Sequence, residues 1–372
     1  MIMHVITNYM ANAGAETMLA RLARASSERA LIVSLIDISE RNQLLSGDRV
    51  RFERLKMHSS AGAASGVFHL ARLISLEKPS VILCWMYHAC IAGLLAQRLS
   101  LHSVPLFWNV RQSLDDPAAL SRSTRAALRI CKYLSYMPTG VIYNSSRSLE
   151  LHRRFGFENS NVEVIPNGFD TVEERPRVRL TPHVFGIAAR FHPQKDYETF
   201  FLAATLLLKQ RSNVRFVAAG AGLSRDNVEV RNMMSAAGLP EAAIELRGQV
   251  DDMAAFYRDV DVLVLSSRTE GFPNVVAEAM SHGKPVVTTD VGDAALVVGD
   301  TGVVVPPRNE QALAEGMRRM IDLGQDDYAA LSLAARQRIA ARFSLAQIAN
   351  RYGSFLARRD WSASPGQPEF GK

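Results

Sequence analysis

Short runs of hydrophobic, mostly β-branched residues alternate with longer amphipathic segments along most of the chain. Twelve such runs stand out: 3–9, 30–36, 50–55, 80–86, 105–110, 140–144, 183–189, 214–220, 244–248, 261–267, 285–290 and 302–307. Helix-length amphipathic patterns, such as 16–26 and 66–76, lie between them. Apolar strands separated by helices are typical of parallel βαβ units with helices on both faces of the sheet.

The alternation stops over the polar, proline-bearing segment 162–183 and then restarts. We therefore predict an α/β protein with two Rossmann-like, doubly wound parallel-sheet domains that face a cleft. The predicted parts are an N-terminal domain at 1–172, a C-terminal domain at 173–344, a final helix at 345–360 and a disordered tail at 361–372. The tail is predicted to be disordered because it is rich in Gly, Pro and Ser.

Composition narrows the protein class. A net charge of +6 over 372 residues is mild, and no zinc-finger spacing, RNP-like motif or long basic tract is present, so we expect no nucleic-acid partner. Three cysteines lack metal-ligand spacing and suggest reduced thiols. The longest apolar stretch, 81–96, is shorter than a membrane span. We expect a cytoplasmic protein, either soluble or peripherally attached at the inner face of the membrane.

The stretch TEGFPNVVAEAM, residues 269–280, places two acids around the start of a short helix that follows a buried strand. Pro273 suits the first helical position, and Gly283 suits the C-terminal stop. The free N–H groups at such a helix start bind phosphate. A ligand spanning Glu270 and Glu278 would offer hydroxyls at both ends and phosphate between them. In the alternative, Glu270 is a solvated loop acid and Glu278 is a helix-surface charge.

This stretch resembles the E-x7-E motif of glycosyltransferase family 4, whose members are retaining nucleotide-sugar enzymes with the GT-B fold. The resemblance continues over 281–293 and includes 164–170, 186–204 and 247–267, whereas in the first domain it is weaker. It implies a metal-independent, retaining hexosyltransferase without a cofactor. The enzyme would move a sugar from a UDP- or GDP-sugar to a glycan or lipid-linked acceptor, in cell-surface polysaccharide or glycolipid biosynthesis. It also implies that the last helix returns to the first domain.

The resemblance also assigns roles to residues. The implied catalytic set is Glu270, on hydroxyls of the transferred sugar, with Arg190 and Lys195 on the diphosphate, where their charges would stabilise the leaving group. The implied donor-binding set is Glu278, on the ribose, with the backbone around Gly271, Phe272, Pro273, Asn274 and Gly14. Taken singly, either cation is an ordinary surface charge, and Gly14 is an ordinary turn residue.

Two acidic patterns need separate interpretation. Asp259 and Asp261 have the D-x-D spacing that other glycosyltransferases use to hold a metal ion. They flank the start of a buried strand, opposite to the expected site, so we predict a structural role. Residues 292–295 read Gly-Asp-Ala-Ala, where the family usually has a second glycine and a Pro-Glu turn.

In the first domain, His88 and Arg111 follow successive strands at the ends expected to face the cleft. We predict acceptor or donor contact for both. The alternatives are a buried structural histidine and an arginine paired with Asp115 or Asp116.

Four cations lie along one face of the helix predicted over 121–137: Arg122, Arg125, Arg129 and Lys132. Such a face can hold an anionic membrane surface, and a solvated helix face is the alternative.

Two other functions fit the same fold. One is a catalytically silent nucleotide-sugar sensor or scaffold, and the other is a GT-B epimerase or phosphorylase. The presence of all four charged residues, Arg190, Lys195, Glu270 and Glu278, argues against a decayed site.

Overall fold

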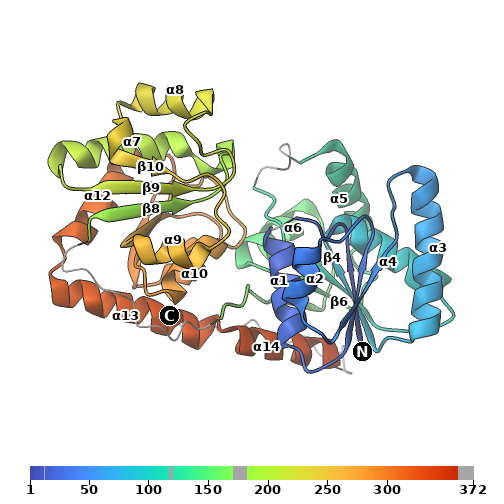
Figure 1. The fold of residues 1–372 in the computed structure, drawn as a ribbon. Helices are drawn as coiled ribbons and strands as arrows, with labels where there is room; N and C mark the ends of the chain where they lie inside the picture. Colours follow the sequence, from blue (N-terminus) through green and yellow to red (C-terminus); the bar gives the residue numbers. More distant parts are fainter. Residues whose placement is uncertain (12, 116, 118–119, 171–181, 359–372) are drawn as a thin grey trace. The chain divides into compact units, whose positions relative to one another are not determined.

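The computed structural model describes residues 1–358 except 12, 116, 118–119 and 171–181. The chain forms two compact units (Figure 1). Unit 1 comprises Met1–Gly168 and the segment from Leu345 onward, and unit 2 comprises Phe169–Ser344. The tail predicted to be disordered, 361–372, lies outside the described residues.

The first boundary lies at residues 168–169, where we expected 172–173. Phe169 explains the difference because it already belongs to unit 2. Its N–H donates to the carbonyl of Phe343 at 2.9 Å, and its ring stacks on Phe272 with centroids 6.0 Å apart. The second boundary lies between Ser344 and Leu345.

Unit 1 contains a seven-stranded parallel sheet in the order β3-β2-β1-β4-β5-β6-β7. Its strands are β1 Ile2–Ile6, β2 Ala30–Ser34, β3 Val50–Arg54, β4 Val81–Trp85, β5 Leu106–Val110, β6 Gly140–Tyr143 and β7 Val162–Val164. The first six coincide with predicted runs. The edge strand β7 was missed, since its three residues open the segment that we interpreted as a polar break.

Helices cover both faces of this sheet. They are α1 Gly14–Ala25, α2 Glu40–Ser46, α3 Ser60–Glu77, α4 Tyr87–Leu99, α5 Arg122–Leu134, α6 Ser146–Phe155 and α14 Leu345–Ala357. Figure 1 shows α1 and α2 together, with α3 and α4 on the other side of the strands. One buried core joins the sheet to α1 and α14, and the other joins it to α3, α4 and α5.

Serine residues begin four of these helices. The side chains of Ser39, Ser59, Ser121 and Ser145 each accept a hydrogen bond from the N–H three residues later. This capping satisfies a donor that has no partner within the helix. A serine N-cap therefore marks the point at which the chain leaves a loop and begins α2, α3, α5 or α6.

Unit 2 contains a six-stranded parallel sheet in the order β10-β9-β8-β11-β12-β13. The strands are β8 Val184–Ala188, β9 Arg215–Ala219, β10 Ile244–Leu246, β11 Val262–Leu265, β12 Val286–Thr289 and β13 Gly302–Val305, and all six coincide with predicted runs. β8 and β11 are neighbours at the centre of the sheet. The loops that leave their carboxyl ends therefore meet at one edge.

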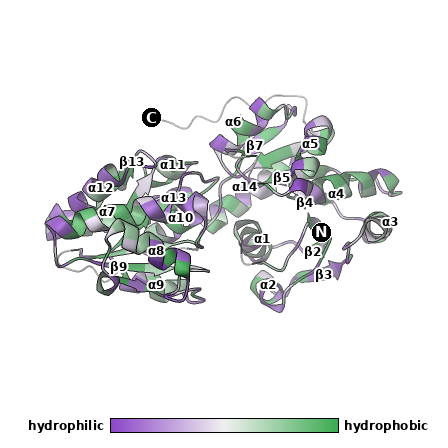
Figure 2. Cartoon of the chain, turned by 90° about the horizontal axis from the view of Figure 1, so that it is seen from above, coloured by the Kyte–Doolittle hydropathy of each residue, from purple (hydrophilic) through white to green (hydrophobic). Residues whose placement is uncertain are grey.

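The helices of unit 2 also form two layers. They are α7 Tyr197–Gln210, α8 Val228–Ala237, α9 Met253–Asp259, α10 Asn274–Ser281, α11 Ala294–Val298, α12 Glu310–Asp322 and α13 Gln325–Arg342, with 3₁₀ turns at Pro193–Lys195 and Glu241–Ala243. One core joins the sheet to α7, α8 and α12, and the other joins it to α9, α10, α11 and α13. Most helices show both hydrophobic and hydrophilic colours in Figure 2, as expected for amphipathic helices packed on a sheet.

The three cysteines, Cys84, Cys90 and Cys131, are buried and unpaired. Burial raises the pKa of each thiol, so none is poised to react. Within the described ranges, no helix combines the length and the apolar character that a membrane span needs.

The helix α14 packs closely on unit 1. Its Phe355 lies edge-on to Phe107 of β5, with ring centroids 5.6 Å apart. At the helix start, Gly168 lies so close that an added Cβ would be 2.9 Å from the Cα of Leu345. Gly353 lies within α14 itself, and a Cβ there would meet nothing within 4 Å. The two glycines therefore test the docking of α14 with opposite expectations.

We expect Gly168→Ala to destabilise unit 1 by roughly 1–3 kcal/mol, since the backbone of α14 would have to shift. Gly353→Ala should instead stabilise it by roughly 0.5–1 kcal/mol, because alanine favours an exposed helix position.

The free energy of unfolding would be measured in urea from the fluorescence of Trp85 and Trp108, which are buried in unit 1. A Trp361→Phe background removes the third tryptophan of the chain. Equal effects of the two glycine substitutions would contradict close docking of α14.

Candidate functional site

Glu270 is fixed by two hydrogen bonds at the carboxyl end of β11. The Ser267 hydroxyl donates to its Oε1 at 2.7 Å, and the Lys195 ammonium donates to the same oxygen at 2.5 Å. The side chains of Lys195 and Glu270 are 21% and 13% exposed, respectively. This ion pair joins the loop after β8 to the loop after β11, and the solvated-acid interpretation of Glu270 does not describe its surroundings.

Further bonds tie the same two loops together. The Ser266 hydroxyl donates to the carbonyl of Lys195 at 2.7 Å, and Arg268 donates to Asp196 at 2.6 Å. Asp196 is buried and has a left-handed backbone, with φ at 52°. It also accepts a bond from the Thr199 hydroxyl at 2.8 Å. The position of Lys195 is thus set by its neighbours on both sides.

Arg190 lies on the same loop but is exposed, and it forms no hydrogen bond or ion pair with the residues that the structure describes. His192 stands between the two cations in sequence. Burial lowers the pKa of His192, and the positive charges of Arg190 and Lys195 lower it further. The imidazole is therefore neutral at neutral pH. The positive charge of this loop comes from Arg190 and Lys195, which can bind an anion.

The helix α10 begins beside Glu270. Pro273 is its N-cap, with φ at −80° and ψ at 85°, so the helix starts at Asn274, one residue later than we predicted. The ring of Phe272 is buried and packs on Phe169 and Phe343, which leaves only its backbone for a ligand. At the other end, Gly283 follows the C-cap His282 and takes φ at 68°, as its predicted role as C-terminal stop requires.

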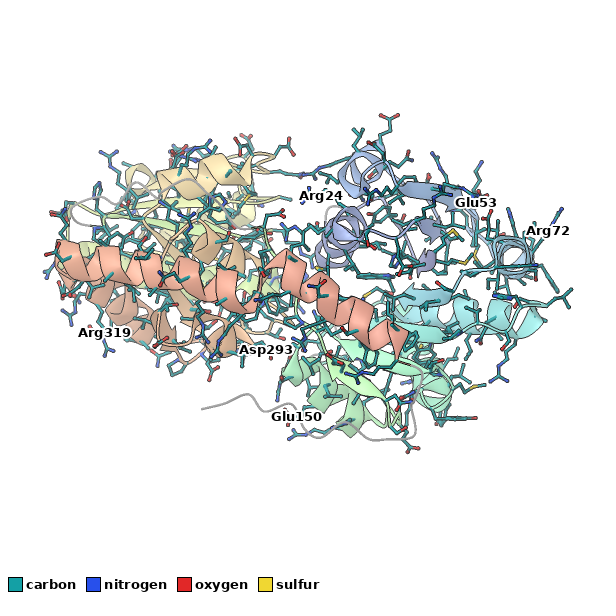
Figure 3. All side chains as sticks on the ribbon, turned by 90° about the horizontal axis from the view of Figure 1, so that it is seen from below. Arg24, Glu53, Arg72, Glu150, Asp293 and Arg319 are labelled. Carbon is teal, nitrogen blue, oxygen red and sulfur yellow. The ribbon has the colours of Figure 1, made fainter. Side chains whose placement is uncertain are left out.

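Gly292 supports the backbone at Glu270 and Gly271. Its φ is 56°, and an added Cβ would lie 2.4 Å from the carbonyl oxygen of Gly271. The N–H of Asp293, labelled in Figure 3, donates to that same carbonyl at 3.2 Å. The turn after β12 therefore packs directly on the loop that carries Glu270, and it requires glycine there.

Glu278 lies one helical turn inside α10. The hydroxyl of Tyr257, from α9, donates to its Oε2 at 3.2 Å. The ring of Tyr257 stacks on His282 with centroids 5.1 Å apart. Glu278 is four positions after Asn274, which corresponds to a rise of about 6 Å along the helix. The two acids of the motif thus occupy one loop–helix segment, each with a hydroxyl donor.

The D-x-D pattern has the structural role that we predicted. A carboxylate oxygen of Asp261 accepts hydrogen bonds from the N–H groups of His183 and Val184, both at 3.0 Å. Asp259 pairs with Arg247 at 2.7 Å. Across the described part of the chain, no group of three or more His, Cys, Asp or Glu side chains is placed to hold a metal ion.

Three candidate residues belong to unit 1. Gly14 is the first residue of α1. His88 is half-buried on α4, and burial lowers the pKa of its imidazole. Arg111 follows β5 and is buried, and its Nη1 donates to the hydroxyl of Tyr352 at 3.0 Å. His88 and Arg111 therefore lie in different surroundings.

The helix α5 presents the four predicted cations, of which Arg122 and Arg129 are exposed and Arg125 and Lys132 are partly buried. Two side chains that we had not considered lie on the same helix. Ile130 is 47% exposed and Tyr133 is 72% exposed. The outer surface of α5 thus combines positive charge with apolar and aromatic groups.

Several site residues escaped the sequence interpretation. Ser267 could have been found, because it ends the predicted run 261–267, three residues before Glu270. The pairing of Asp196 with Arg268 and that of Tyr257 with Glu278 join distant positions and left no signal in the spacing.

Comparison with known proteins finds related families along most of the chain. Residues 12–173 match the family model described as Glycosyltransferase Family 4, and residues 182–322 match the one described as Glycosyl transferases group 1. A glycosyltransferase of Methanocaldococcus jannaschii is 28% identical over 69% of this chain and 70% of its own length. A D-inositol 3-phosphate glycosyltransferase of Corynebacterium aurimucosum is 23% identical over 77% of this chain and 75% of its own.

The crystal structure of Anabaena HepE in complex with UDP and glucose has the same fold. Its TM-score is 0.79 at 23% identity, covering 96% of this chain and 99% of that one. The two family matches follow one another along the chain, and each falls on one of the two parallel-sheet units. The chain therefore belongs to glycosyltransferase family 4 and has the GT-B fold.

Proposed function

We propose that the protein is a retaining glycosyltransferase that moves a sugar from a UDP- or GDP-sugar to a glycan or lipid-linked acceptor, with no resident cofactor or metal ion. The observation that supports it most strongly is the Lys195–Glu270 pair at the start of α10. The pair places an oriented acid and a cation beside the start of a helix, an arrangement that suits a sugar next to a diphosphate.

The donor would extend from Glu270 to Glu278. Lys195 and Ser267 both bond to Oε1 of Glu270, and Oε2 accepts no hydrogen bond from the residues that the structure describes, so it is available to a sugar hydroxyl. Arg190 and Lys195 would hold the diphosphate, and Glu278 would accept from ribose hydroxyls. The complex of HepE with UDP and glucose supports a nucleotide-sugar partner of this kind.

In the proposed reaction, the bond from the anomeric carbon to the diphosphate oxygen breaks. A bond to the acceptor oxygen forms on the same face of the sugar, and a diphosphate oxygen takes the acceptor's proton. Arg190 and Lys195 would stabilise the negative charge that builds on the leaving group. Because the leaving group itself serves as the base, no protein carboxylate has to do so.

We further propose that the protein works in the cytoplasm at the inner face of the membrane, in cell-surface polysaccharide or glycolipid biosynthesis. The basic outer surface of α5 supports this, since its cations attract anionic headgroups. Exposed Ile130 and Tyr133 supply the apolar and aromatic contacts that favour the interface.

The first prediction concerns the donor. UDP or GDP should raise the melting temperature of the wild type. Glu278→Gln should weaken the binding of that nucleotide at least about tenfold, which corresponds to a loss of about 1.4 kcal/mol in binding free energy. The change keeps the shape of the side chain and removes its charge. Thermal shift over a range of nucleotide concentrations measures both effects, with Glu229→Gln, an exposed position on α8, as the matched control.

The second prediction concerns turnover. Lys195→Met should lower the rate of UDP release from UDP-glucose, or of GDP release from a GDP-sugar, by roughly 100-fold or more, since the leaving group loses a fixed cation. Lys209→Met, at an exposed position on α7, should leave the rate unchanged. Nucleotide binding without turnover in the wild type, tested with a panel of sugar acceptors, would instead support the silent sensor.

The third prediction concerns the membrane. Replacing Arg122, Arg125, Arg129 and Lys132 with Glu should abolish co-sedimentation with anionic vesicles. A control with the same change in net charge replaces four exposed arginines elsewhere in unit 1, namely Arg24, Arg29, Arg41 and Arg49. If both variants bind vesicles equally, membrane contact through α5 is wrong.

A further inference from the structure

A row of polar residues lies just beyond the carboxyl ends of three strands in unit 1. Ile6, Trp85, Asn109 and Ile142 stand opposite one another across β1, β4, β5 and β6. Asn8, Arg111 and Asn144 each come two residues after a member of this row, just beyond the end of the strand. Arg111 contacts Tyr352 of α14, the helix that covers one face of the sheet.

Arg111 is the unusual member of the row. It is 9% exposed, and its Nη1 donates to the hydroxyl of Tyr352 at 3.0 Å. Its guanidinium lies 5.6 Å from the ring centroid of Trp85. Nε and Nη2 are buried and have no hydrogen-bond partner among the described residues. These two nitrogens form one edge of the planar group, the edge that matches two oxygens of a carboxylate or phosphate.

No described carboxylate pairs with this guanidinium. Asp115, one of the two partners considered from the sequence, pairs with Arg147 at 3.0 Å, and Asp116 lies outside the described residues. Burial lowers the pKa of Arg111, in the direction expected for a charge that lacks a compensating anion. A buried cation without a partner is costly, so a site of this kind favours an incoming anion.

Two amide oxygens on side chains linked to Arg111 or Tyr352 also lack a hydrogen-bond partner among the described residues. Asn109 donates to the hydroxyl of Tyr352 at 3.0 Å, and Asn144 donates to the carbonyl of Arg111 at 3.2 Å. These bonds orient both amides and leave each Oδ1 buried, with no partner in the described ranges. An amide oxygen in this position accepts from a hydroxyl. The row thus combines donors for an anion with acceptors for hydroxyl groups.

We propose that Arg111 binds an anionic group of the acceptor, a carboxylate or a phosphate, through its Nε and Nη2 edge. Asn109 and Asn144 then accept hydrogen bonds from neighbouring hydroxyls, so the acceptor class is an acidic sugar or a phosphate-bearing polyol. The role as acceptor site rests on the proposed function, whereas the binding of an anion does not. Tyr352 acts as a positioning residue, since its hydroxyl holds both Asn109 and Arg111.

The test uses the full-length protein with saturating UDP, so that the cations of unit 2 are occupied. The soluble probes are glucuronate and glucose 6-phosphate, with glucose as the neutral control, and titration calorimetry measures binding. We expect the wild type to bind at least one of the two anions and not glucose. Arg111→Lys should weaken anion binding at least tenfold, because lysine keeps the charge but lacks the two-pronged edge.

A second arm identifies the source of the anion. Vesicles containing phosphatidic acid are compared with neutral phosphatidylcholine vesicles, for the wild type and Arg111→Lys. Binding of a soluble anion that depends on Arg111 indicates a free acidic sugar, and dependence seen only with phosphatidic acid indicates a lipid phosphate. Both results support the anion subsite. Anion binding that is absent, or unchanged in Arg111→Lys, overturns it.

Asn109→Asp provides an independent check. It places a carboxylate on the side chain that shares the hydroxyl of Tyr352 with Arg111, and so supplies the missing partner internally. The variant should melt at a higher temperature and bind the anions at least tenfold more weakly. A lower melting temperature with anion binding retained contradicts the proposal.

The two proposals fail separately. UDP binding and its loss in Glu278→Gln report on unit 2, whereas the anions report on unit 1. If the protein turns over a donor but anion binding does not depend on Arg111, the proposed function stands and the anion subsite is wrong. If anion binding depends on Arg111 but no nucleotide binds, the anion subsite stands and the proposed function is wrong.

Discussion

The ion pair between Lys195 and Glu270 is the constraint on which the candidate donor site depends. Parallel strands β8 and β11 end at the same edge, but the chain leaves them in separate loops. The pair joins these loops, and Ser266 fixes the carbonyl of Lys195 while Ser267 fixes the carboxylate. An acid and a cation that would each move freely on a loop are thereby held in place before any ligand arrives, which lowers the cost of binding.

Close backbone packing provides the second constraint. The loop of Glu270 lies against the turn at Gly292, where any side chain would collide with the carbonyl of Gly271. Phe272 is fixed in the core of unit 2. The start of α10 therefore presents its backbone from a rigid support, and in the proposed function the contacts with a ligand at this edge fall to Glu270, Glu278 and the cations.

Periodicity sufficed for the layers of the fold, because buried parallel strands are continuous apolar runs and the helices between them are amphipathic. It failed for β7, whose three residues are too few to show a period, and for the boundary, which depends on where Phe169 packs. The charged residues of the site were visible as a motif. Their partners were not, since the contacts of Asp196 with Arg268 and of Tyr257 with Glu278 arise only when separate elements meet.

The two units treat buried charge in opposite ways. In unit 2, the charge of Asp196 is met by Arg268, and Glu270 is met by Lys195, so the protein itself neutralises these groups. In unit 1, Arg111 is more deeply buried than Lys195, yet the only described hydrogen-bond partner of its guanidinium is a neutral hydroxyl. A fold that pairs its charges in one unit gains nothing from leaving a guanidinium unpaired in the other, unless a ligand supplies the opposite charge. The cost of burying Arg111 is then offset on binding, which makes affinity depend on the charge of the acceptor.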